Sequence, residues 1–341
     1  MQTFLPRVWL LVGDKAGDNA QATAVAEALG WPVEVRRLAF QAPYRVGKPK
    51  FKPSLYHIDQ DLSDPLLPPW PDLVITIGRR PAMAALWVKQ QSGGRTKIVL
   101  LGRPKGYFSA FDLVVVPRQY FVPDRPNVLK LTLPLLRVDR QAVEAAAKAW
   151  RERLECLPKP LVAVLVGGAT KPYRLDEAVA RRLLDEAQKA VAGRGTLYIS
   201  TSRRTPIEII QALDALKPAN ALLYRYGLDK PEDNPYLALL GLADGCIVTA
   251  DSVSMMVEAL RLRKPLAIFS LPIQNAKRML VKRWMLKLIG GRDLSAMHSL
   301  MFERGWAVPL GQGEFPYPPP RLEIPDELTE VVRRITTLVG K

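Results

Sequence analysis

Short runs of consecutive apolar residues recur along this chain, and most end at a glycine-containing turn that leads into a segment with helical spacing. Runs without polar alternation are typical of strands buried on both faces. Strand, turn and helix in repetition predict a parallel sheet covered by helices. The elements expected first are strands 8–12, 33–37, 73–77, 97–101 and 113–116, with helices over 20–29 and from Pro81.

The pattern pauses and then restarts. Residues 41–71 are rich in proline and polar groups and are expected to be irregular, and a long helix near 141–157 precedes Pro158 and Pro160. The elements expected after the pause are strands 161–166, 196–200, 245–249 and 265–269, helices over 176–191, from Ile207 and from near Ser254, and a last helix over 326–338.

The two series predict an α/β protein made of two Rossmann-like, doubly wound domains that face each other across a cleft. The expected parts are an N-terminal domain over 1–140, a linker helix over 141–158, a C-terminal domain over 159–314, and a proline-rich bridge with a last helix over 315–341. Ligands of such sheets bind beyond the carboxyl ends of the strands, so candidate site residues are those that follow each strand.

Composition narrows the class of protein. The chain has 341 residues, of which 48% are hydrophobic, which is enough for two domains with full cores. Every apolar run is shorter than the roughly 18 residues of a membrane span, and the start of the chain predicts a buried strand rather than a signal peptide. Cys156 and Cys246 lie far apart, which favours a reducing cytoplasm over disulfides or a zinc site. With only His57 and His298 present, histidine-based metal chemistry is disfavoured.

The net charge of +16 indicates a polyanionic partner: a phosphorylated substrate, a nucleic acid or an anionic membrane surface. Nucleic acid is least favoured, because no helix-turn-helix, zinc-finger or RNP-like motif is present. A basic amphipathic helix is expected over 275–289, with Leu280, Trp284 and Leu288 on its apolar face. This helix could bind a membrane surface, or it could pack on the protein with its basic side in solvent.

The first strand ends in a turn that carries both charges and glycines. This turn, GDKAGDN over 13–19, offers Asp14, Lys15, Asp18 and Asn19 as candidate site residues. It matches neither a Walker loop nor the GxGxxG pattern. The structural alternative is a capped turn with Asp18 as N-cap.

Arginines follow two further strand ends. Arg79 and Arg80 come directly after Gly78, and Arg103 follows Gly102. Guanidinium groups suit bidentate contacts with phosphate or carboxylate, and adjacent arginines point in different directions, so one of the pair is expected to reach a ligand. The alternative is ordinary surface charge.

The second half offers a candidate diphosphate site at two strand ends. The residues concerned are Gly168, Thr170, Thr201, Ser202, Arg203 and Arg204. Amide, hydroxyl and guanidinium groups at a predicted helix start can hold a diphosphate without a metal ion. The alternative is helix capping by Ser202 or Thr205.

A third strand end in the second half reads VTADSVSMMVEAL over 248–260. Asp251, Ser252 and Ser254 lie where the apolar strand passes into a helix, and Glu258 follows one turn on. The free N–H groups and positive dipole end of the helix suit a phosphate, and Glu258 could hold a ribose diol. The alternative is a simple capped helix with Ser252 or Ser254 as N-cap.

Several enzyme classes are disfavoured by what the strand ends lack. Asp59 and Asp61 form an acidic pair, but they lie in the irregular segment, and the sequence contains no Gly-x-Ser-x-Gly elbow. These observations argue against a metalloenzyme, a serine hydrolase and a P-loop ATPase. No metal and no other cofactor is expected.

Eight motifs together resemble the bacterial relatives of the plant mitochondrial fission factor, over about residues 5–310. The motifs are GDKAGDNAQ (13–21), TIGRRPA (76–82), LGRPK (101–105), FDLVVVPRQY (111–120), VAVLVGGATKPYRLD (162–176), STSRRTP (200–206), NPYLALLGLAD (234–244) and TADSVSMMVEA (249–259). This family is GT-B glycosyltransferase-like in fold. The resemblance therefore implies two Rossmann-like domains, with a terminal helix that returns to the first domain.

The resemblance leaves three functions open. Similarity to lipid-directed GT-B enzymes implies a metal-independent glycosyltransferase that uses a nucleotide-sugar on an envelope lipid or glycan, in the cytoplasm and at the inner face of the membrane. The plant member is a peripheral adaptor that recruits a dynamin-related protein, which implies a non-catalytic adaptor with a vestigial donor site. A nucleotide-sugar epimerase of the same fold is the third possibility.

The resemblance also assigns roles by position. In the first domain, Asp14 or Asp18 would be the general base that removes a proton from the acceptor hydroxyl. The residues that would contact substrate are Lys15, Asn19, Arg79 and Arg103, and those that would hold the nucleotide are Gly168, Thr170, Thr201, Ser202, Arg203, Arg204, Asp251, Ser252, Ser254 and Glu258. Positive groups would replace a divalent ion in neutralising the leaving diphosphate.

Overall fold

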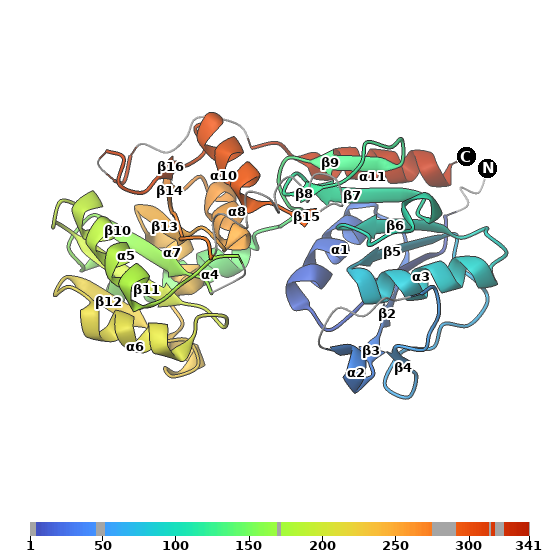
Figure 1. The fold of residues 1–341 in the computed structure, drawn as a ribbon, viewed down its shortest axis with the longest axis horizontal. Coiled ribbons are helices and arrows are strands. Elements are labelled where there is room, and N and C mark those ends of the chain that lie inside the picture. The colour runs from blue at the N-terminus through green and yellow to red at the C-terminus, as the bar shows by residue number, and fades with distance from the viewer. Residues whose placement is uncertain are drawn as a thin grey trace. The chain divides into compact units, whose positions relative to one another are not determined.

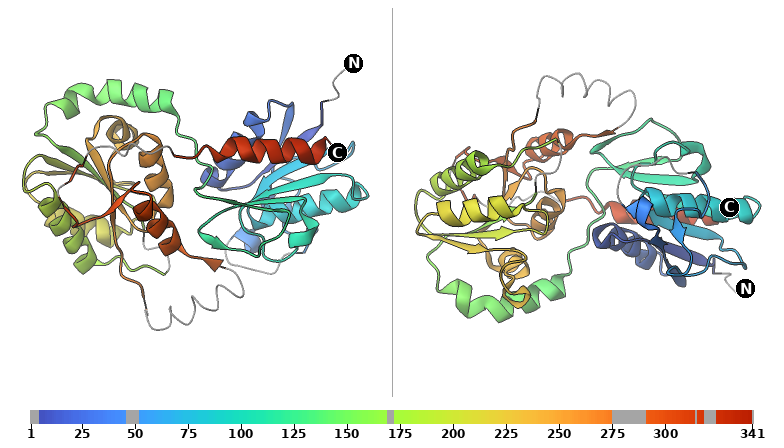
Figure 2. Two further views of the ribbon diagram at one scale, coloured as in Figure 1. Left: turned by 90° about the horizontal axis from the view of Figure 1, so that it is seen from above. Right: turned by 60° about the horizontal axis from the view of Figure 1, so that its bottom comes forward.

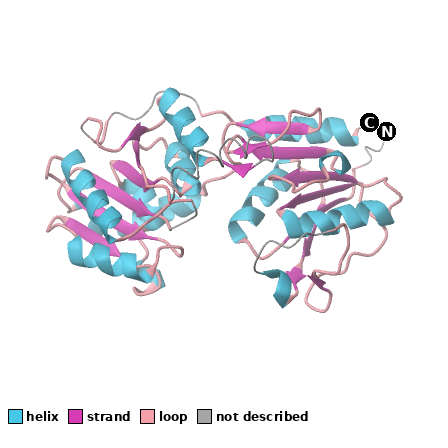
Figure 3. Ribbon diagram, viewed as in Figure 1, coloured by secondary structure: helices cyan, strands magenta, loops and turns pink. Residues whose placement is uncertain are grey.

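In the computed structural model the described residues are 5–45, 52–168, 172–274, 291–313, 315–317 and 324–340. The chain divides into two compact units (Figure 1). Unit 1 consists of Met1–Arg137 together with Pro325–Lys341, and unit 2 consists of Val138–Ile324. In both units the strands lie between helices (Figure 3).

Unit 1 contains a six-stranded sheet in which all neighbours are parallel. The strand order is β2 (Val33–Arg37), β1 (Val8–Val12), β5 (Leu73–Ile77), β6 (Lys97–Leu101), β7 (Leu113–Pro117) and β9 (Val128–Leu131). The other elements of unit 1 are α1 (Ala16–Ala28), β3 (Ala39–Phe40), α2 (Ala42–Arg45), β4 (Ile58–Asp59), α3 (Arg79–Gln91), the 3-10 helix η1 (Phe108–Ala110), β8 (Tyr120–Phe121) and α11 (Glu327–Val339).

The sheet of unit 1 has a separate core on each face, because neighbouring residues of a strand point to opposite sides. Val8, Leu10 and Val12 of β1 pack with α1 and α11, whereas Trp9 and Leu11 pack with α3. Both faces are therefore covered, which explains why the strands read as unbroken apolar runs.

The last helix of the chain completes unit 1. In Figure 2, α11 (red) lies beside α1, with which it is in contact. Its Val331 and Ile335 are fully buried in the core that β1 and α1 share. Both carboxylate oxygens of Glu327, in its first turn, accept backbone N–H groups, from Thr132 at 2.6 Å and from Leu133 at 3.0 Å. A helix distant in sequence thus closes the hydrophobic core of the first unit.

Unit 2 repeats this architecture. Its six parallel strands have the order β12 (Ala221–Tyr224), β11 (Thr196–Thr201), β10 (Leu161–Val166), β13 (Gly245–Thr249), β14 (Leu266–Phe269) and β16 (Val308–Pro309). The other elements of unit 2 are α4 (Arg140–Glu155), α5 (Glu177–Ala190), α6 (Ile207–Leu216), the 3-10 helix η2 (Pro231–Asp233), α7 (Tyr236–Leu242), α8 (Val253–Arg261), β15 (Gly291–Arg292) and α10 (Leu294–Glu303). Helix α5 packs with α6, α4 packs with α7, and α8 packs on β13 and β14.

Each sheet has one point where the winding direction reverses. In unit 1 it lies between β1 and β5, and in unit 2 it lies between β10 and β13. Loops leave these neighbouring strands toward opposite faces, which opens a crevice at their carboxyl ends where ligands of doubly wound sheets bind. The predicted fold class of two doubly wound Rossmann-like domains is confirmed.

Several predicted boundaries differ from the structure. Helix α1 begins at Ala16 rather than at residue 20, so that Gly17 lies inside it, and α3 begins at Arg79 rather than at Pro81. The described part of the segment 41–71, predicted to be irregular, contains two short elements, α2 and β4. The unpredicted elements include β9, β12, α7, α10 and β16.

One prediction falls outside the part of the chain that the structure describes. The basic helix expected over 275–289 lies in residues that are not described. Among the helices that are described, none combines the length and the apolar character needed to cross a bilayer.

Candidate functional site

A small polar pocket lies at the reversal point of unit 1. Its volume is about 130 Å³, enough for a group of several atoms rather than a single water molecule. The lining residues are Gly13, Asp14, Lys15, Asp18, Asn19, Tyr44, Ile77, Gly78, Arg79, Arg80 and Pro81. Five of the residues predicted for the first half therefore meet in one place, because they follow the adjacent strands β1 and β5.

Arg80 is the most firmly held charge of this pocket. Its side chain is only 12% exposed, and its guanidinium donates to both carboxylate oxygens of Asp14, at 2.7 and 3.0 Å. It also donates to the carbonyl of Tyr44 and lies 4.1 Å above the ring of Phe40. These contacts fix the position of Asp14. Of the two adjacent arginines, Arg80 is therefore the one with a structural role.

The N-terminal loop is closed by a side-chain amide. Asn19 accepts the N–H of Gly13 at 3.1 Å and donates to the carbonyl of the same residue at 2.8 Å. Asp18 lies in the first turn of α1, and a Cβ built on Gly78 would be 3.9 Å from its carboxylate. The N-cap of α1 is Lys15, so the alternative prediction of Asp18 as N-cap is wrong.

The remaining arginines of unit 1 differ in position. Arg79 is half-buried beside the pocket, and burial, followed by the nearby charge of Arg80, lowers its pKa. Arg103 follows β6 and is also half-buried, with a pKa lowered by burial, but it is not among the residues that line the pocket. The structure therefore brings Arg79, but not Arg103, together with Asp14 and Asp18.

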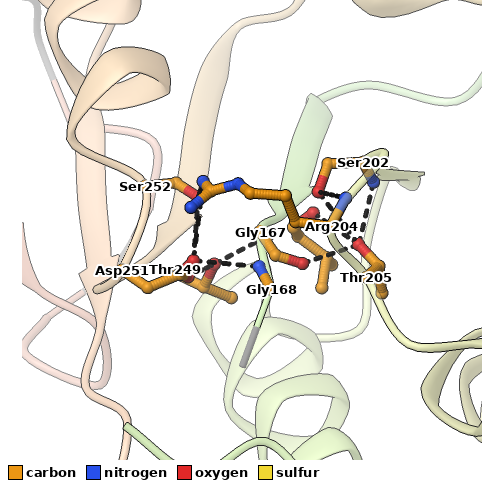
Figure 4. A network of polar contacts seen from close by, with 9 residues as sticks. Gly167, Gly168, Ser202, Arg204, Thr205, Thr249, Asp251 and Ser252 are labelled. Carbon is orange, nitrogen blue, oxygen red and sulfur yellow. Dashed lines mark hydrogen bonds and ion pairs between the residues drawn. The ribbon is translucent and has the colours of Figure 1, made fainter. Parts of the chain in front are cut away.

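In unit 2 the reversal point is occupied by a tightly closed glycine turn, shown in Figure 4. A Cβ on Gly167 would lie 2.0 Å from the hydroxyl of Ser252, and one on Gly168 would lie 2.4 Å from the carbonyl oxygen of Arg204. Only glycine fits such distances. The loops after β10, β11 and β13 consequently touch each other through the backbone of this turn.

A buried carboxylate ties two of these loops together. Asp251 is 1% exposed, and its oxygens accept the N–H of Gly168 and the hydroxyl of Thr249. The Thr249 hydroxyl oxygen in turn accepts the N–H of Gly167. The pKa of Asp251 is raised overall, because the effect of burial exceeds the opposing effect of these hydrogen bonds and of the nearby Arg204. Asp251 was predicted to bind nucleotide; in the structure both of its oxygens accept hydrogen bonds from within the protein, which hold the turn in position.

The loop after β11 is held by its hydroxyl groups. Thr205 donates to the carbonyl of Gly167 at 2.6 Å and accepts the N–H of Ser202. Thr201 is 3% exposed and donates to the carbonyl of Tyr224. The N-cap of α6 is Pro206, so the alternative of capping by Ser202 or Thr205 is wrong. These hydroxyls therefore shape the loop that carries Arg203 and Arg204.

Arg204 spans the gap between this loop and the start of α8. Its side chain is 48% exposed; its guanidinium donates to the hydroxyl of Ser252 at 3.2 Å and lies 3.7 Å from Asp251. Figure 4 shows the side chain extending across Gly167 toward Ser252. Arg203 is exposed on the same loop. A guanidinium and a helix N-terminus therefore meet at the reversal point.

Helix α8 begins after the short loop that follows β13. Ser252 is its N-cap, as one alternative predicted, yet the Ser252 side chain makes no capping hydrogen bond to the first N–H groups of the helix. Ser254 is exposed in the first turn. Uncapped N–H groups at a helix start are satisfied by water or by a ligand.

Glu258 lies one turn beyond Ser254 on the same face of α8. It is half-buried and accepts a hydrogen bond from the hydroxyl of Tyr236, the first residue of α7. The pKa of the Glu258 carboxyl is raised overall, because the effect of burial exceeds the opposing effect of the hydrogen bond from Tyr236. Sequence patterns did not predict Tyr236 as a site residue, because it lies 22 positions from Glu258. Thr170 lies outside the described residues.

Metal ligands do not gather at either place. Among the residues that the structure describes, no three His, Cys, Asp or Glu side chains are grouped so that they could hold a metal ion.

Comparison with known sequences assigns the family. The family described as Mitochondrial fission ELM1 matches residues 16–289. The chain belongs to this family. The Mitochondrial fission protein ELM1 of Arabidopsis thaliana is 27% identical over 220 residues, which cover 58% of this chain and 51% of the plant protein. This ELM1-family chain thus matches only about half the length of its plant relative.

A second relative matches a larger share of the chain. An uncharacterized protein of Rickettsia prowazekii (strain Madrid E) is 26% identical over 302 residues, covering 79% of this ELM1-family chain and 84% of the Rickettsia protein.

Solved structures share a general likeness with the ELM1-family chain. A UDP-GlcNAc 2-epimerase from Neisseria meningitidis bound to UDP-GlcNAc is 11% identical, with a TM-score of 0.48 and coverage of 98% of this chain and 100% of that chain. A UGT transferase from Siraitia grosvenorii in complex with UDP is 10% identical, with a TM-score of 0.47 and coverage of 98% and 91%. The fold assignment rests on the strand order of the two sheets, and nothing about ligand or reaction follows from these similarities.

Proposed function

We propose that this ELM1-family protein is a metal-independent glycosyltransferase that binds a nucleotide-sugar in unit 2. The observation that carries the proposal is the convergence of Arg204, the uncapped start of α8 and the glycine turn at the reversal point of that sheet. Anions bind where backbone N–H groups and a guanidinium point to one location. The match to the ELM1 family is compatible with this function but does not require it.

A diphosphate is the anion best suited to this place. The N–H groups at the start of α8 would bind one phosphate, and Arg204 with Arg203 would neutralise the second. The exposed hydroxyl of Ser254 would add a hydrogen bond. In a transfer reaction the bond between the sugar and the diphosphate breaks, and the same positive groups stabilise the charge of the leaving nucleoside diphosphate.

Unit 1 would supply the acceptor site and the general base. Two carboxylates line its pocket, and the sequence left both as candidates for the base. Arg80 donates to both oxygens of Asp14, and Lys15 lies 3.9 Å from an oxygen of Asp18. We assign the base to one of these two carboxylates, which takes the proton of the acceptor hydroxyl as that oxygen bonds to the sugar. Asn19 keeps the loop closed, and Arg79 and Lys15 contact the acceptor.

The acceptor class follows from the charge of the whole chain. A net charge of +16 favours work on an anionic partner, and an envelope lipid or glycan at the inner face of the membrane meets this condition. The protein would then bind the membrane peripherally, from the cytoplasm.

The family match favours one alternative, a non-catalytic adaptor. The plant relative is named a mitochondrial fission protein, and such a role needs no intact donor site. An adaptor of this kind would keep the fold of unit 2 without binding nucleotides. Measuring nucleotide binding therefore distinguishes the adaptor from the transferase.

The test is calorimetric titration of the full chain with UDP, GDP, ADP and CDP, with Ser254→Asp as the decisive variant. A carboxylate at this exposed position is favourable to the α8 dipole, so the fold is retained, yet it repels a phosphate. We expect one nucleotide to bind, and the variant to weaken its affinity by about 10-fold or more.

Gln141→Asp is the matched control, because it adds the same charge to an exposed first turn of α4 in the same unit. That turn lies near the other end of α8, where Arg140 donates to the carbonyl of Arg261. The control variant should bind like the unmodified protein. If the folded protein binds none of the four nucleotides, the transferase proposal is wrong and the adaptor function is favoured.

A further inference from the structure

The hydrogen bond between Tyr236 and Glu258 joins two helices beside the proposed donor site. Glu258 is on α8, six residues after the N-cap Ser252 and therefore about 9 Å along the helix axis. Ser254 and Glu258 are four residues apart and share one face of the helix, separated by one turn of about 5.4 Å. A nucleotide whose phosphates lie at the helix start would place its ribose near Glu258.

The phenol of Tyr236 is fixed in position by its own helix. The residues Ala238, Leu239 and Leu240 of α7 are buried, α7 packs against α4, and the Tyr236 N–H donates to the side chain of Asn234. Burial, with the charge of Glu258, raises the pKa of Tyr236 well above its ordinary value, so the hydroxyl keeps its proton. It therefore donates, and one oxygen of Glu258 is its acceptor.

This arrangement leaves the second carboxylate oxygen of Glu258 as an oriented acceptor. A carboxylate accepts at about four lone-pair positions, and a phenol takes one of them. A neighbouring diol supplies two hydroxyl donors to the remaining positions. If a half-buried carboxylate loses one of these donors, part of the free-energy cost of its desolvation is no longer offset by a hydrogen bond.

From this geometry we infer that Tyr236 orients Glu258 to recognise the 2′-hydroxyl of the donor, so that unit 2 selects ribonucleoside diphosphate donors and rejects their 2′-deoxy counterparts. The inference rests on the proposed nucleotide site and adds its substrate class. Tyr236 is a positioning residue, because it acts through Glu258. Deoxythymidine diphosphate sugars are then excluded as donors, whatever the base that the site prefers.

Selectivity for the 2′-hydroxyl is the property to measure. The probes are UDP, GDP, ADP and CDP with their 2′-deoxy forms, titrated into the full chain. A hydrogen bond to a charged group supports discrimination of about 10- to 100-fold, so the ribonucleotide should bind tighter than its deoxy form by that ratio. In Tyr236→Phe the ratio should fall to within about 3-fold, mainly through weaker ribonucleotide binding.

Tyr224→Phe provides the matched control. Tyr224 is a buried tyrosine on β12 of the same unit, and its hydroxyl also donates to an oxygen, the carbonyl of Lys230 at 3.4 Å. Removing this hydroxyl should leave the ratio unchanged. A general loss of stability would weaken both nucleotides alike in either variant, and so would not alter the ratio.

The outcomes separate this inference from the proposed function. Nucleotide binding without discrimination, or discrimination that persists in Tyr236→Phe, would overturn the role of Tyr236 while leaving the nucleotide site intact. If the unmodified chain binds none of the ribonucleotides, the nucleotide site itself is wrong and the inference falls with it.

Discussion

At the scale of single residues, the polar groups nearest the strand ends of unit 2 form hydrogen bonds within the protein. Asp251, Thr201 and Ser252 were predicted as ligand contacts, but each is at most 3% exposed. Their short side chains hold the loops against one another, while the longer side chain of Arg204 reaches outward. In the proposed site, the residues that would contact a ligand are therefore further along the loops than those at the strand ends.

Glu258 gives a prediction about pH. Because burial raises its folded-state pKa above the ordinary value near 4.3, the folded state favours the protonated carboxyl. This contribution to stability is fully present below about pH 4.3 and is lost as the pH rises through the raised pKa. Glu258→Gln removes the titration, so the stability of the variant relative to the unmodified protein should increase from pH 4 to pH 7.

Urea unfolding of both proteins at a series of pH values measures this difference. The glutamine still accepts the Tyr236 hydroxyl, so the comparison isolates the charge. A stability difference that stays constant over this range, or decreases toward neutral pH, would show that Glu258 is not held in a desolvated position.

How far the sequence predicts the site is clear from two cases. Asp14, Lys15, Asp18, Asn19 and Arg79 were predicted together and line one pocket, because the glycine turns after adjacent strands carry them. Tyr236 was not predicted, because its contact with Glu258 depends on the packing of α7 beside α8, which no local pattern encodes.

At the scale of elements, the strands were more predictable than the helix starts. Apolar runs identified β1, β5 and β10 with the observed bounds, since strands buried on both faces have few polar positions. The start of α1 was missed because Gly17 suggested a turn, although its backbone is helical. The sequence could not show that β9 and β12 extend the sheets, because these strands have exposed positions.

The glycine turn of unit 2 gives a prediction at this scale. Gly167→Ala places a Cβ 2.0 Å from the Ser252 hydroxyl and 2.5 Å from the carboxylate of Asp251, so the loops after β10 and β13 must separate. We expect a loss of at least about 2 kcal/mol in unfolding free energy and the loss of nucleotide binding. Denaturant unfolding and calorimetric titration measure the two effects.

Gly17→Ala is the opposite case and serves as the control. Of the described residues, none has an atom within 4 Å of a Cβ built there, and the position is inside α1. Alanine should add about 0.5–1 kcal/mol, because it is the better helix former. If both alanine variants were equally stable, the close contact of the loops after β10 and β13 would be contradicted.

At the scale of the whole molecule, the chain is built from two sheets of the same type with distinct sites. Unit 1 presents a pocket that contains two carboxylates and three cationic side chains, whereas unit 2 presents a guanidinium at an uncapped helix start. The first set is suited to hold an acceptor and take its proton, and the second is suited to hold a diphosphate. This division of chemistry supports a transferase more directly than membership of the ELM1 family does.

The most direct test of this account is amide hydrogen exchange of the full chain, with and without the ribonucleoside diphosphate that binds best. We predict slower exchange at residues 202–205 and at the start of α8, with no change at residues 13–19 or 78–81 of unit 1. Protection confined to unit 1, or no protection anywhere in the folded protein, would contradict a donor site at the reversal point of unit 2.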